Sequence, residues 1–210
     1  MIVTVNQRDV NHSNTFPMKR TTYAQPNEPK QPPTPRKGFT ILANDPSITA
    51  WGWAVLDVDC NLLDKGCIKT KTEGKKRRIR KGDEDVHRTE AITSELLRVI
   101  KKYNVQYIVT ELPHGSQNAA AAKMIGICVG VIVGIALSSD LGVEWYSEGD
   151  SKKAALGKIA AHKQEMIDAM SKIYKVKWTG IKYIDEAVAD ALGIHNVALK
   201  ESATLKLVNK

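Results

Sequence analysis

Residues 39–57 decide the fold, and they read FTILANDPSITAWGWAVLD. Phe39 to Ala43 is an apolar run that predicts a strand, and the following Asn-Asp-Pro-Ser has the composition of a turn. Trp51 to Asp57 predicts a second strand. Residues 60–64 predict another turn and residues 65–70 a third strand, so this part of the chain is expected to form an antiparallel meander.

After the meander, strands and helices alternate. Helical spacing of apolar residues predicts an amphipathic helix, and short apolar runs predict buried strands. In chain order we expect a helix over 86–103, a strand over 107–111, a helix over 118–137, a strand over 142–146, and helices over 151–157, 162–174 and 184–198. This order predicts an α/β domain over residues 38–210, with a mixed five-stranded sheet flanked by helices.

Residues 1–37 differ from the rest in composition, because they hold six of the eight prolines among Asn, Gln, Thr and Lys. Such a segment buries too little apolar surface to offset the entropy of ordering it. We therefore expect a disordered, basic, proline-rich tail before the folded domain.

The overall charge points to a polyanionic partner. The 31 Lys and Arg residues exceed the 23 Asp and Glu residues, which gives a formal net charge of +8. Nucleic acid and an anionic membrane surface both fit this charge. The most apolar run, residues 124–137, is shorter than the ~18 residues expected of a membrane span, so it predicts a buried core helix and no membrane partner. The three cysteines form no CxxC pair and are expected to be reduced thiols.

Three acidic residues stand where the predicted elements end or pack. Asp45 follows the first strand, Glu111 closes the fourth strand, and Asp190 lies in a small, apolar stretch of the last helix. A carboxylate in such a stretch is unexpected unless it has a partner. Each residue alone also fits an ordinary structural role, but together they predict one acidic site.

Glu186 precedes Asp190 by four residues, so both side chains share one face of the helix. Converging carboxylates repel one another unless a cation is present. Their hard oxygen ligands favour Mg²⁺, with Mn²⁺ as the alternative ion. Two such ions can activate water and stabilise the leaving oxygen of a phosphodiester. We therefore predict a metal site formed by Asp45, Glu111, Glu186 and Asp190.

The chain resembles the RuvC-type Holliday junction resolvases of the RNase H-like superfamily over about residues 39–200. The resemblance is carried by four motifs in order: ILANDP with Gly52; Glu111 with Asn118, Gly126 and Gly130; Lys152 with Gly157 and Lys163; and the ADAL of residues 189–192. It implies an RNase H-like fold, a homodimer, and paired Mg²⁺-dependent nicking of a four-way DNA junction. Lys152 and Lys163 would then bind phosphate, with Lys163 also in a catalytic role.

The chain departs from the family pattern at three places. The family's third carboxylate usually stands three residues before the last Asp, where this chain has Ala187. Glu186 and Asp185 are the available substitutes, and helical geometry favours Glu186, with Asp185 as a helix cap. His114 occupies a position that is often an aromatic wedge, where it could stack on a base or contact phosphate. Pro-Ser-Ile follows Asp45 where the family favours Pro-Gly-Ser.

A basic run lies between the third strand and the first helix. Its predicted DNA contacts are Lys75, Lys76, Arg77, Arg78, Arg80 and Lys81, to which the resemblance adds His114, Asn118, Lys152 and Lys163. Cations of this kind neutralise phosphates and give steep salt dependence. A nuclear localisation signal and a solvated, self-repelling loop are the other interpretations of the run.

The helices over 86–103 and 118–137 are the candidates for a dimer face. Gly126, Gly130 and Gly134 recur every four residues and allow close helix packing, either between subunits or inside the domain. A two-fold dimer suits a junction that presents two symmetric strands.

The leading hypothesis is therefore a structure-selective endonuclease that resolves branched DNA. One alternative is a nuclease for other branched DNA or structured RNA. Another is a catalytically weakened DNA-binding protein, which the absence of a carboxylate at Ala187 keeps open. The tail, the altered motifs and the size suggest a phage-encoded or mobile-element protein acting in a bacterial cytoplasm.

Overall fold

The computed structural model describes residues 38–72 and 80–208, and the structural statements below concern these residues. The predicted tail over residues 1–37 lies outside them. The strands are β1 (Thr40–Asp45), β2 (Ala50–Asp57), β3 (Leu62–Lys69), β4 (Tyr107–Glu111) and β5 (Gly142–Tyr146). The helices are α1 (Lys81–Tyr103), α2 (Ala119–Ser138), α3 (Glu148–Leu156), α4 (Lys163–Ile173), α5 (Lys182–Glu201) and α6 (Ala203–Val208).

The strands form one mixed sheet in the order β3-β2-β1-β4-β5. β1, β2 and β3 pair antiparallel, whereas β1 pairs parallel with β4 and β4 pairs parallel with β5. The predicted five-stranded sheet is therefore confirmed. Because β1, β4 and β5 run in the same direction, their carboxyl ends meet at one edge of the sheet.

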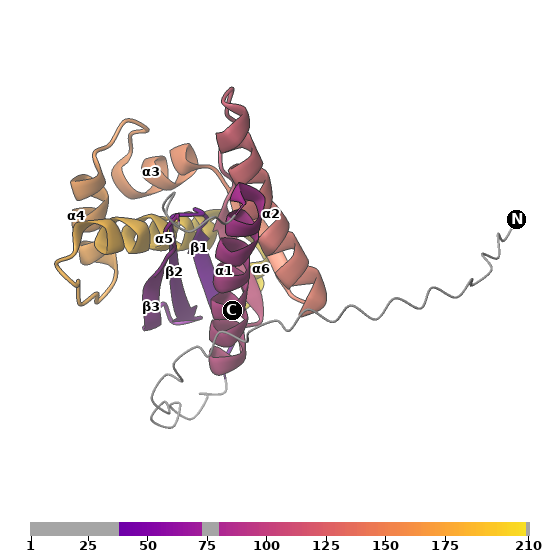
Figure 1. The fold of residues 1–210 in the computed structure, drawn as a ribbon. Helices are drawn as coiled ribbons and strands as arrows, with labels where there is room; N and C mark the ends of the chain where they lie inside the picture. Colours follow the sequence, from indigo (N-terminus) through magenta and orange to yellow (C-terminus); the bar gives the residue numbers. More distant parts are fainter. Residues whose placement is uncertain (1–37, 73–79, 209–210) are drawn as a thin grey trace, which may run out of the picture. The chain divides into compact units, whose positions relative to one another are not determined.

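Helices cover both faces of the sheet (Figure 1). On one face α5 packs across β1, β2 and β4, with α4 beside it. On the other face α1 and α2 pack on the alternate side chains of the same strands, which point away from α5, such as Leu42 and Ile108. Since side chains alternate along a strand, a strand that is covered on both faces reads as an almost continuous apolar run. That accounts for the run that begins at Phe39.

Three helices begin earlier than the sequence predicted, and one of them is α5, which starts at Lys182 instead of Ile184. α1 starts at Lys81 instead of Val86, and its first turn contains Asp83 and Glu84, which suit the positive end of the helix dipole. α3 starts at Glu148 instead of Ser151, because Ser147 and Asp150 form a capping box. The first turns of α1 and α3 are charged and lack the apolar spacing by which a sequence indicates a helix. The short helix α6 was not predicted.

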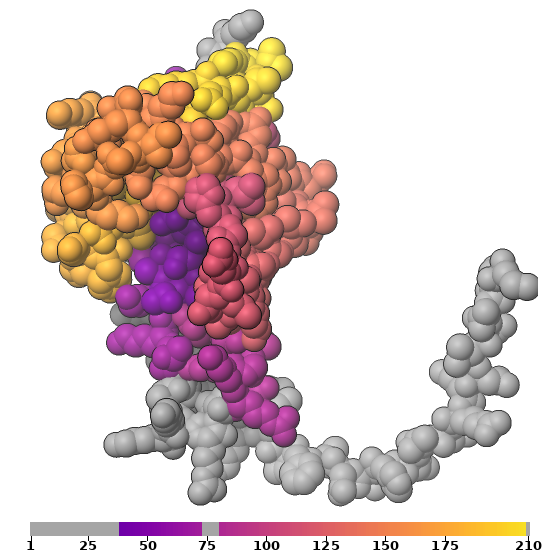
Figure 2. Space-filling view, turned by 90° about the horizontal axis from the view of Figure 1, so that it is seen from above, coloured from indigo at the N-terminus to yellow at the C-terminus, as the bar shows by residue number. Residues whose placement is uncertain are grey.

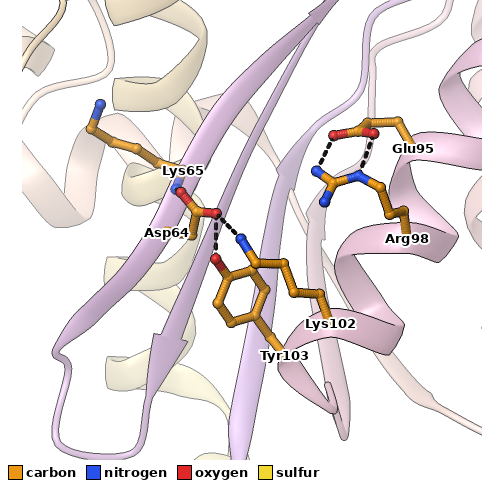
Figure 3. A network of polar contacts seen from close by, with 6 residues as sticks. All are labelled: Asp64, Lys65, Glu95, Arg98, Lys102 and Tyr103. Carbon is orange, nitrogen blue, oxygen red and sulfur yellow. Dashed lines mark hydrogen bonds and ion pairs between the residues drawn. The ribbon is translucent and has the colours of Figure 1, made fainter. Parts of the chain in front are cut away.

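A polar contact fixes the end of α1 to β3 (Figure 3). Lys102 Nζ lies 3.2 Å from Asp64 Oδ2, and the Tyr103 hydroxyl donates a hydrogen bond to the same oxygen. The Asp64 carboxylate thus anchors the last turn of α1 to the edge strand of the sheet.

The expectation that the apolar run forms a buried core helix is wrong in one respect. α2 has 20 residues and a mean hydropathy of 2.3, but only 22% of its most apolar window is buried. By length and composition alone it could cross a membrane. Its buried residues lie toward the sheet, whereas Val133 and Leu137 are exposed, Leu137 by 79%. An uncovered apolar side of this kind is typical of a surface that meets a partner or a membrane.

Candidate active site

Two of the predicted carboxylates stand at neighbouring strand ends. Asp45 is the last residue of β1 and Glu111 the last of β4. Asn44 and Thr110, the residues just before them, are register partners in the parallel pair. The two side chains therefore emerge from the same edge of the sheet. Seen from above in Figure 2, the indigo segment of β1 and β2 reaches the surface between the orange α3–α4 region and the rose start of α2.

Asp190 reaches this edge from α5. Twelve consecutive residues of that helix, 187–198, are buried, and Asp190 itself is only 9% exposed. The helix lies unusually close to β2, because a Cβ atom built on Gly52 would be 2.0 Å from the Ala187 carbonyl oxygen. Gly52 is also the register partner of Asp45. The glycine after the first motif therefore lets α5 bring Asp190 toward Asp45.

Burial, together with neighbouring charges, raises the pKa values of all three carboxylates. Burial, and then the charges of Asp190 and Glu111, hold the pKa of Asp45 well above its usual value. Burial, and then the charges of Glu148 and Asp190, raise the pKa of Glu111 to about 7. Burial also raises the pKa of Asp190, although Lys163 opposes the shift. Carboxylates gathered in this way repel one another when ionised, and a cation would relieve that repulsion.

In the metal-free protein, Lys163 at the start of α4 supplies a positive charge to the cluster. Its ammonium group donates a hydrogen bond to Asp190 Oδ2. Burial lowers the pKa of Lys163, but the charge and hydrogen bond of Asp190 outweigh it and leave this pKa raised. The second predicted lysine, Lys152, pairs with Glu148 at 2.6 Å and is only 16% exposed. Both predicted phosphate-binding lysines thus lie among the carboxylates.

The donor set fits a hard divalent ion. Within residues 38–72 and 80–208, no three His, Cys, Asp or Glu side chains converge closely enough to form a ready-made metal cage. The charges of Asp45, Glu111 and Asp190 nevertheless act on one another. A looser cluster still suits Mg²⁺, because this ion keeps several waters and needs only one or two protein carboxylates before substrate binds. With Lys163 on Asp190, the carboxylates need not converge in the metal-free protein.

The predicted fourth ligand, Glu186, lies apart from the strongest interactions. Its carboxylate is 4.0 Å from Lys182 Nζ, and the charges that act most strongly on Asp45 come from Asp190, Glu111, Lys163 and Glu148. A metal-binding role for Glu186 stays a prediction. Its neighbour Asp185 is a structural residue, since it accepts hydrogen bonds from the backbone of Thr179 and Gly180 before α5.

Glu148 is the acidic residue of this site that the sequence did not reveal. It is the first residue of α3, directly after β5, and its charge raises the pKa values of Asp45, Glu111 and Asp190. The Ser147–Asp150 capping pair was the signal that would have moved the helix start to this position.

The predicted DNA contacts are distributed unevenly. His114 is exposed, and its charge lowers the pKa of Glu148, which places it near the carboxylates. Asn118 caps α2 by accepting hydrogen bonds from the backbone of Ala120 and Ala121. Arg80 and Lys81 are exposed at the start of α1. The remaining members of the basic run lie outside the described residues: Lys75, Lys76, Arg77 and Arg78.

Comparisons with known proteins place this geometry in a family. The family model described as crossover junction endodeoxyribonuclease RuvC matches residues 41–197. The RuvC protein of Ehrlichia chaffeensis is 27% identical over 155 residues, covering 72% of this chain and 93% of that protein. The RuvC protein of Halothermothrix orenii is 27% identical over 162 residues, covering 74% and 89%.

Solved structures agree with the fold. Thermus thermophilus RuvC in complex with Holliday junction substrate has a TM-score of 0.61 at 21% identity, covering 76% of this chain and 92% of that one. The yeast mitochondrial Holliday junction resolvase Ydc2 has a TM-score of 0.55 at 10% identity, covering 80% and 81%. The predicted RNase H-like fold is thus confirmed. Since the family model spans most of the chain and includes Asp45, Glu111 and Asp190, the protein belongs to the RuvC family of crossover junction endodeoxyribonucleases.

Proposed function

We propose that this protein resolves four-way DNA junctions by paired, metal-dependent hydrolysis of phosphodiester bonds. The observation that carries the proposal is the gathering of Asp45, Glu111 and Asp190 at one edge of a RuvC-type sheet. Members of this family depend on a divalent metal. Two Mg²⁺ ions, with Mn²⁺ as the alternative, suit the oxygen donors.

The metal, when bound, supplies a Lewis acid that activates water and stabilises the leaving oxygen of the phosphodiester. Asp45, Glu111 and Asp190 would hold it, and the loss of their mutual repulsion would favour binding. Lys163 then gives up its hydrogen bond with Asp190 and offers its ammonium group to a DNA phosphate. A lysine is suited to this exchange because it is a compact point charge on a flexible stem.

DNA binding is supported by the chain's +8 net charge and by the cations near the site. Lys152 and Lys163 contact phosphate close to the cleaved bond, and His114 and Asn118 lie on the segment between β4 and α2. Arg80 and Lys81, with the rest of the basic run, bind the phosphates of the junction arms. Neutralised phosphates make the affinity fall steeply with salt.

We also propose a homodimer, formed through the groove between α1 and α2. The groove is lined by Thr89, Thr93, Leu97, Ile127, Gly130 and Gly134. A Cβ atom on Gly126, Gly130 or Gly134 would meet no atom within 4 Å, so these positions are open to a partner. A second copy is the occupant that the chemistry favours, because two symmetric strands must be cut. The proposed place of action is the cytoplasm of a bacterium or of a phage-infected host, and phage origin stays a prediction.

The test compares a synthetic four-way junction with a linear duplex of the same sequence, in Mg²⁺ or in EDTA. Wild type is run beside Asp45→Asn, Glu111→Gln, Asp190→Asn and the control Glu201→Gln, whose residue is exposed at the end of α5. We expect symmetric nicks in the junction only, lost in EDTA and reduced at least about a hundredfold in the three site variants. Equal cutting of the duplex, or activity that survives EDTA, contradicts the proposal.

One observation favours a second candidate, a junction-binding protein with weakened catalysis. Ala187 stands at the position of a usual family carboxylate. Mobility-shift binding to the junction in the presence of Mg²⁺ or Mn²⁺, with no cleavage in either ion, would support this candidate over the nuclease.

A further inference from the structure

Ala187 has no side-chain ligand for a metal ion, and the nearest acidic side chain on the same helix, Glu186, is not among the charges that act most strongly on Asp45. Ala187 is 5% exposed, and its backbone lies against β2 at Gly52. The adjacent Glu186 has its carboxylate 4.0 Å from Lys182 on the preceding turn of the same helix. A carboxylate on another element that acts more strongly on the cluster is therefore the better candidate for a fourth ligand.

The end of β5 brings Glu148 to the edge where Glu111 lies. Tyr146, the last residue of β5, is the register partner of Glu111, and the Leu112 amide donates a 2.8 Å hydrogen bond to the Tyr146 carbonyl. Glu148 follows two residues later as the first residue of α3. The end of β4 and the start of α3 are thus held side by side by backbone hydrogen bonds.

The first turn of α3 is itself fixed. The Asp150 amide donates a 3.0 Å hydrogen bond to Ser147 Oγ, and the Ser147 amide donates a 3.2 Å hydrogen bond to Asp150 Oδ2. This capping box removes two unsatisfied donors and sets the direction in which the chain enters the helix. The backbone that carries Glu148 is therefore held in place before any ligand binds.

Glu148 also lies close enough to the acidic cluster for its charge to act on the other carboxylates. Its charge raises the pKa values of Asp45, Glu111 and Asp190. After burial, it is the strongest influence on the pKa of Glu111. Its carboxylate is 41% exposed, so an ion from solution can reach it, and Lys152 Nζ lies 2.6 Å away. Glu148 and Lys152 thus repeat the pairing of Asp190 with Lys163.

We propose that Glu148 supplies the metal-binding carboxylate that Ala187 lacks. In the metal-free protein two lysines, Lys152 and Lys163, neutralise two of the four carboxylates. On metal binding Glu148 turns its carboxylate from Lys152 to the ion, and Lys152 becomes available for phosphate. The inference rests on the proposed function, since it names a further ligand of the same site.

The test measures Mn²⁺ binding to the full chain without DNA, by isothermal titration calorimetry and by the electron paramagnetic resonance of bound Mn²⁺. The variants are Glu148→Gln, Glu186→Gln and the exposed control Glu201→Gln. We expect Glu148→Gln to weaken Mn²⁺ binding at least about tenfold, a loss typical of a weakened metal site. The other two variants are expected to bind as wild type does.

A rescue variant makes the test sharper. Glu148→Gln combined with Ala187→Asp returns a carboxylate to the usual family position, and we expect it to recover Mn²⁺ binding. Thermal melting of each variant reports whether it is folded. If the double variant does not fold, the comparison of Mn²⁺ binding by Glu148→Gln and Glu186→Gln tests the inference. Unchanged Mn²⁺ binding in Glu148→Gln, or a loss confined to Glu186→Gln, overturns the inference.

The measurement also separates this inference from the proposed function. If wild type cuts the junction and Glu148→Gln binds Mn²⁺ normally, the inference fails and the function stands. A loss of junction affinity in EDTA with normal Mn²⁺ binding would likewise overturn it, since Glu148 would then act only by positioning Lys152. If wild type cuts no junction but Glu148→Gln loses Mn²⁺, the function fails and the metal ligand stands.

Discussion

Gly52 lies so close to Ala187 that a Cβ atom on the glycine would be 2.0 Å from the alanine carbonyl oxygen. The contact joins two parts of the site. Gly52 is the register partner of Asp45, and Ala187 lies about one helical turn before Asp190. The separation between β2 and α5 at this contact therefore sets the position of the Asp190 carboxylate relative to that of Asp45.

The first prediction concerns this contact. In Gly52→Ala the added methyl group collides with backbone, which cannot rotate away, so α5 must shift. We expect a loss of at least about 2 kcal/mol in the free energy of unfolding, measured in urea, together with weaker junction cleavage. Gly82→Ala in α1 is the matched control, because a Cβ atom there meets nothing within 4 Å. Equal stability of the two variants would show that the site does not depend on this contact.

The second prediction concerns pH. Burial, with the charges of Glu148 and Asp190, raises the pKa of Glu111 to about 7 from 4.5. The folded state then holds this proton more tightly than the unfolded state does. The resulting stabilisation is complete below about pH 4.5 and is lost as the pH rises through about 7. In EDTA, the melting temperature of wild type should therefore fall relative to that of Glu111→Gln over this range.

Bound metal is expected to oppose this fall in melting temperature with rising pH, because the ion and the proton compete for the same carboxylates. The stabilisation by Mg²⁺ should grow as the pH rises from about 5 to about 8 and should be smaller in Glu111→Gln. A wild-type and variant pair whose melting curves shift in parallel with pH, with and without Mg²⁺, would contradict the assignment of Glu111.

The third prediction concerns Lys163. Its removal in Lys163→Gln leaves Asp190 without its cationic partner. Because Lys163 is half exposed, water screens part of the interaction, and we expect a loss of about 1 kcal/mol in metal-free stability. A double-mutant cycle with Asp190→Asn isolates the pair. Cleavage should fall more sharply, by about a hundredfold, if the ammonium group contacts the phosphate. Lys158→Gln, which removes an exposed pair with Glu165, is the control.

The strand ends of the site were predictable from sequence, and the reason is visible in β1 and β4. Each is an apolar run that is buried on both faces and followed by a single acidic residue, so the positions of Asp45 and Glu111 follow from local pattern. Asn44 shows the limit of the same reasoning. It looks like a turn residue, but it is fully buried in β1 and accepts a 3.0 Å hydrogen bond from the Trp51 indole.

Glu148 and α2 could not be predicted in the same way. The place of Glu148 depends on the pairing of β4 with β5, a contact between segments far apart in sequence. Hydropathy identified α2 as apolar, but it cannot distinguish burial inside the domain from burial against a partner. Only the structure shows that most of the helix is uncovered.

The fourth prediction follows from that uncovered helix. Val133 and Leu137 are exposed on α2 by 40% and 79%, next to open glycines that favour close helix contact. Both residues lie beside the groove and not in its lining, on the uncovered apolar side of α2. A charge on this apolar side is expected to raise the dissociation constant of the dimer at least about tenfold. We therefore expect Val133→Glu and Leu137→Glu to elute as monomers in size-exclusion chromatography with light scattering, where wild type elutes as a dimer.

The control for α2 is Ile173→Glu, an exposed apolar residue on α4, a helix that does not line the groove, and this variant should leave the dimer intact. Monomeric variants that remain folded should still bind Mn²⁺, because Asp45, Glu111 and Asp190 all come from one chain. They should lose paired cutting, since nicks on the two symmetric strands require two sites held together. A wild type that is monomeric at micromolar concentration with junction DNA would exclude this role of α2. Recovery of wild type only from the membrane fraction would instead indicate that the apolar face of α2 meets lipid.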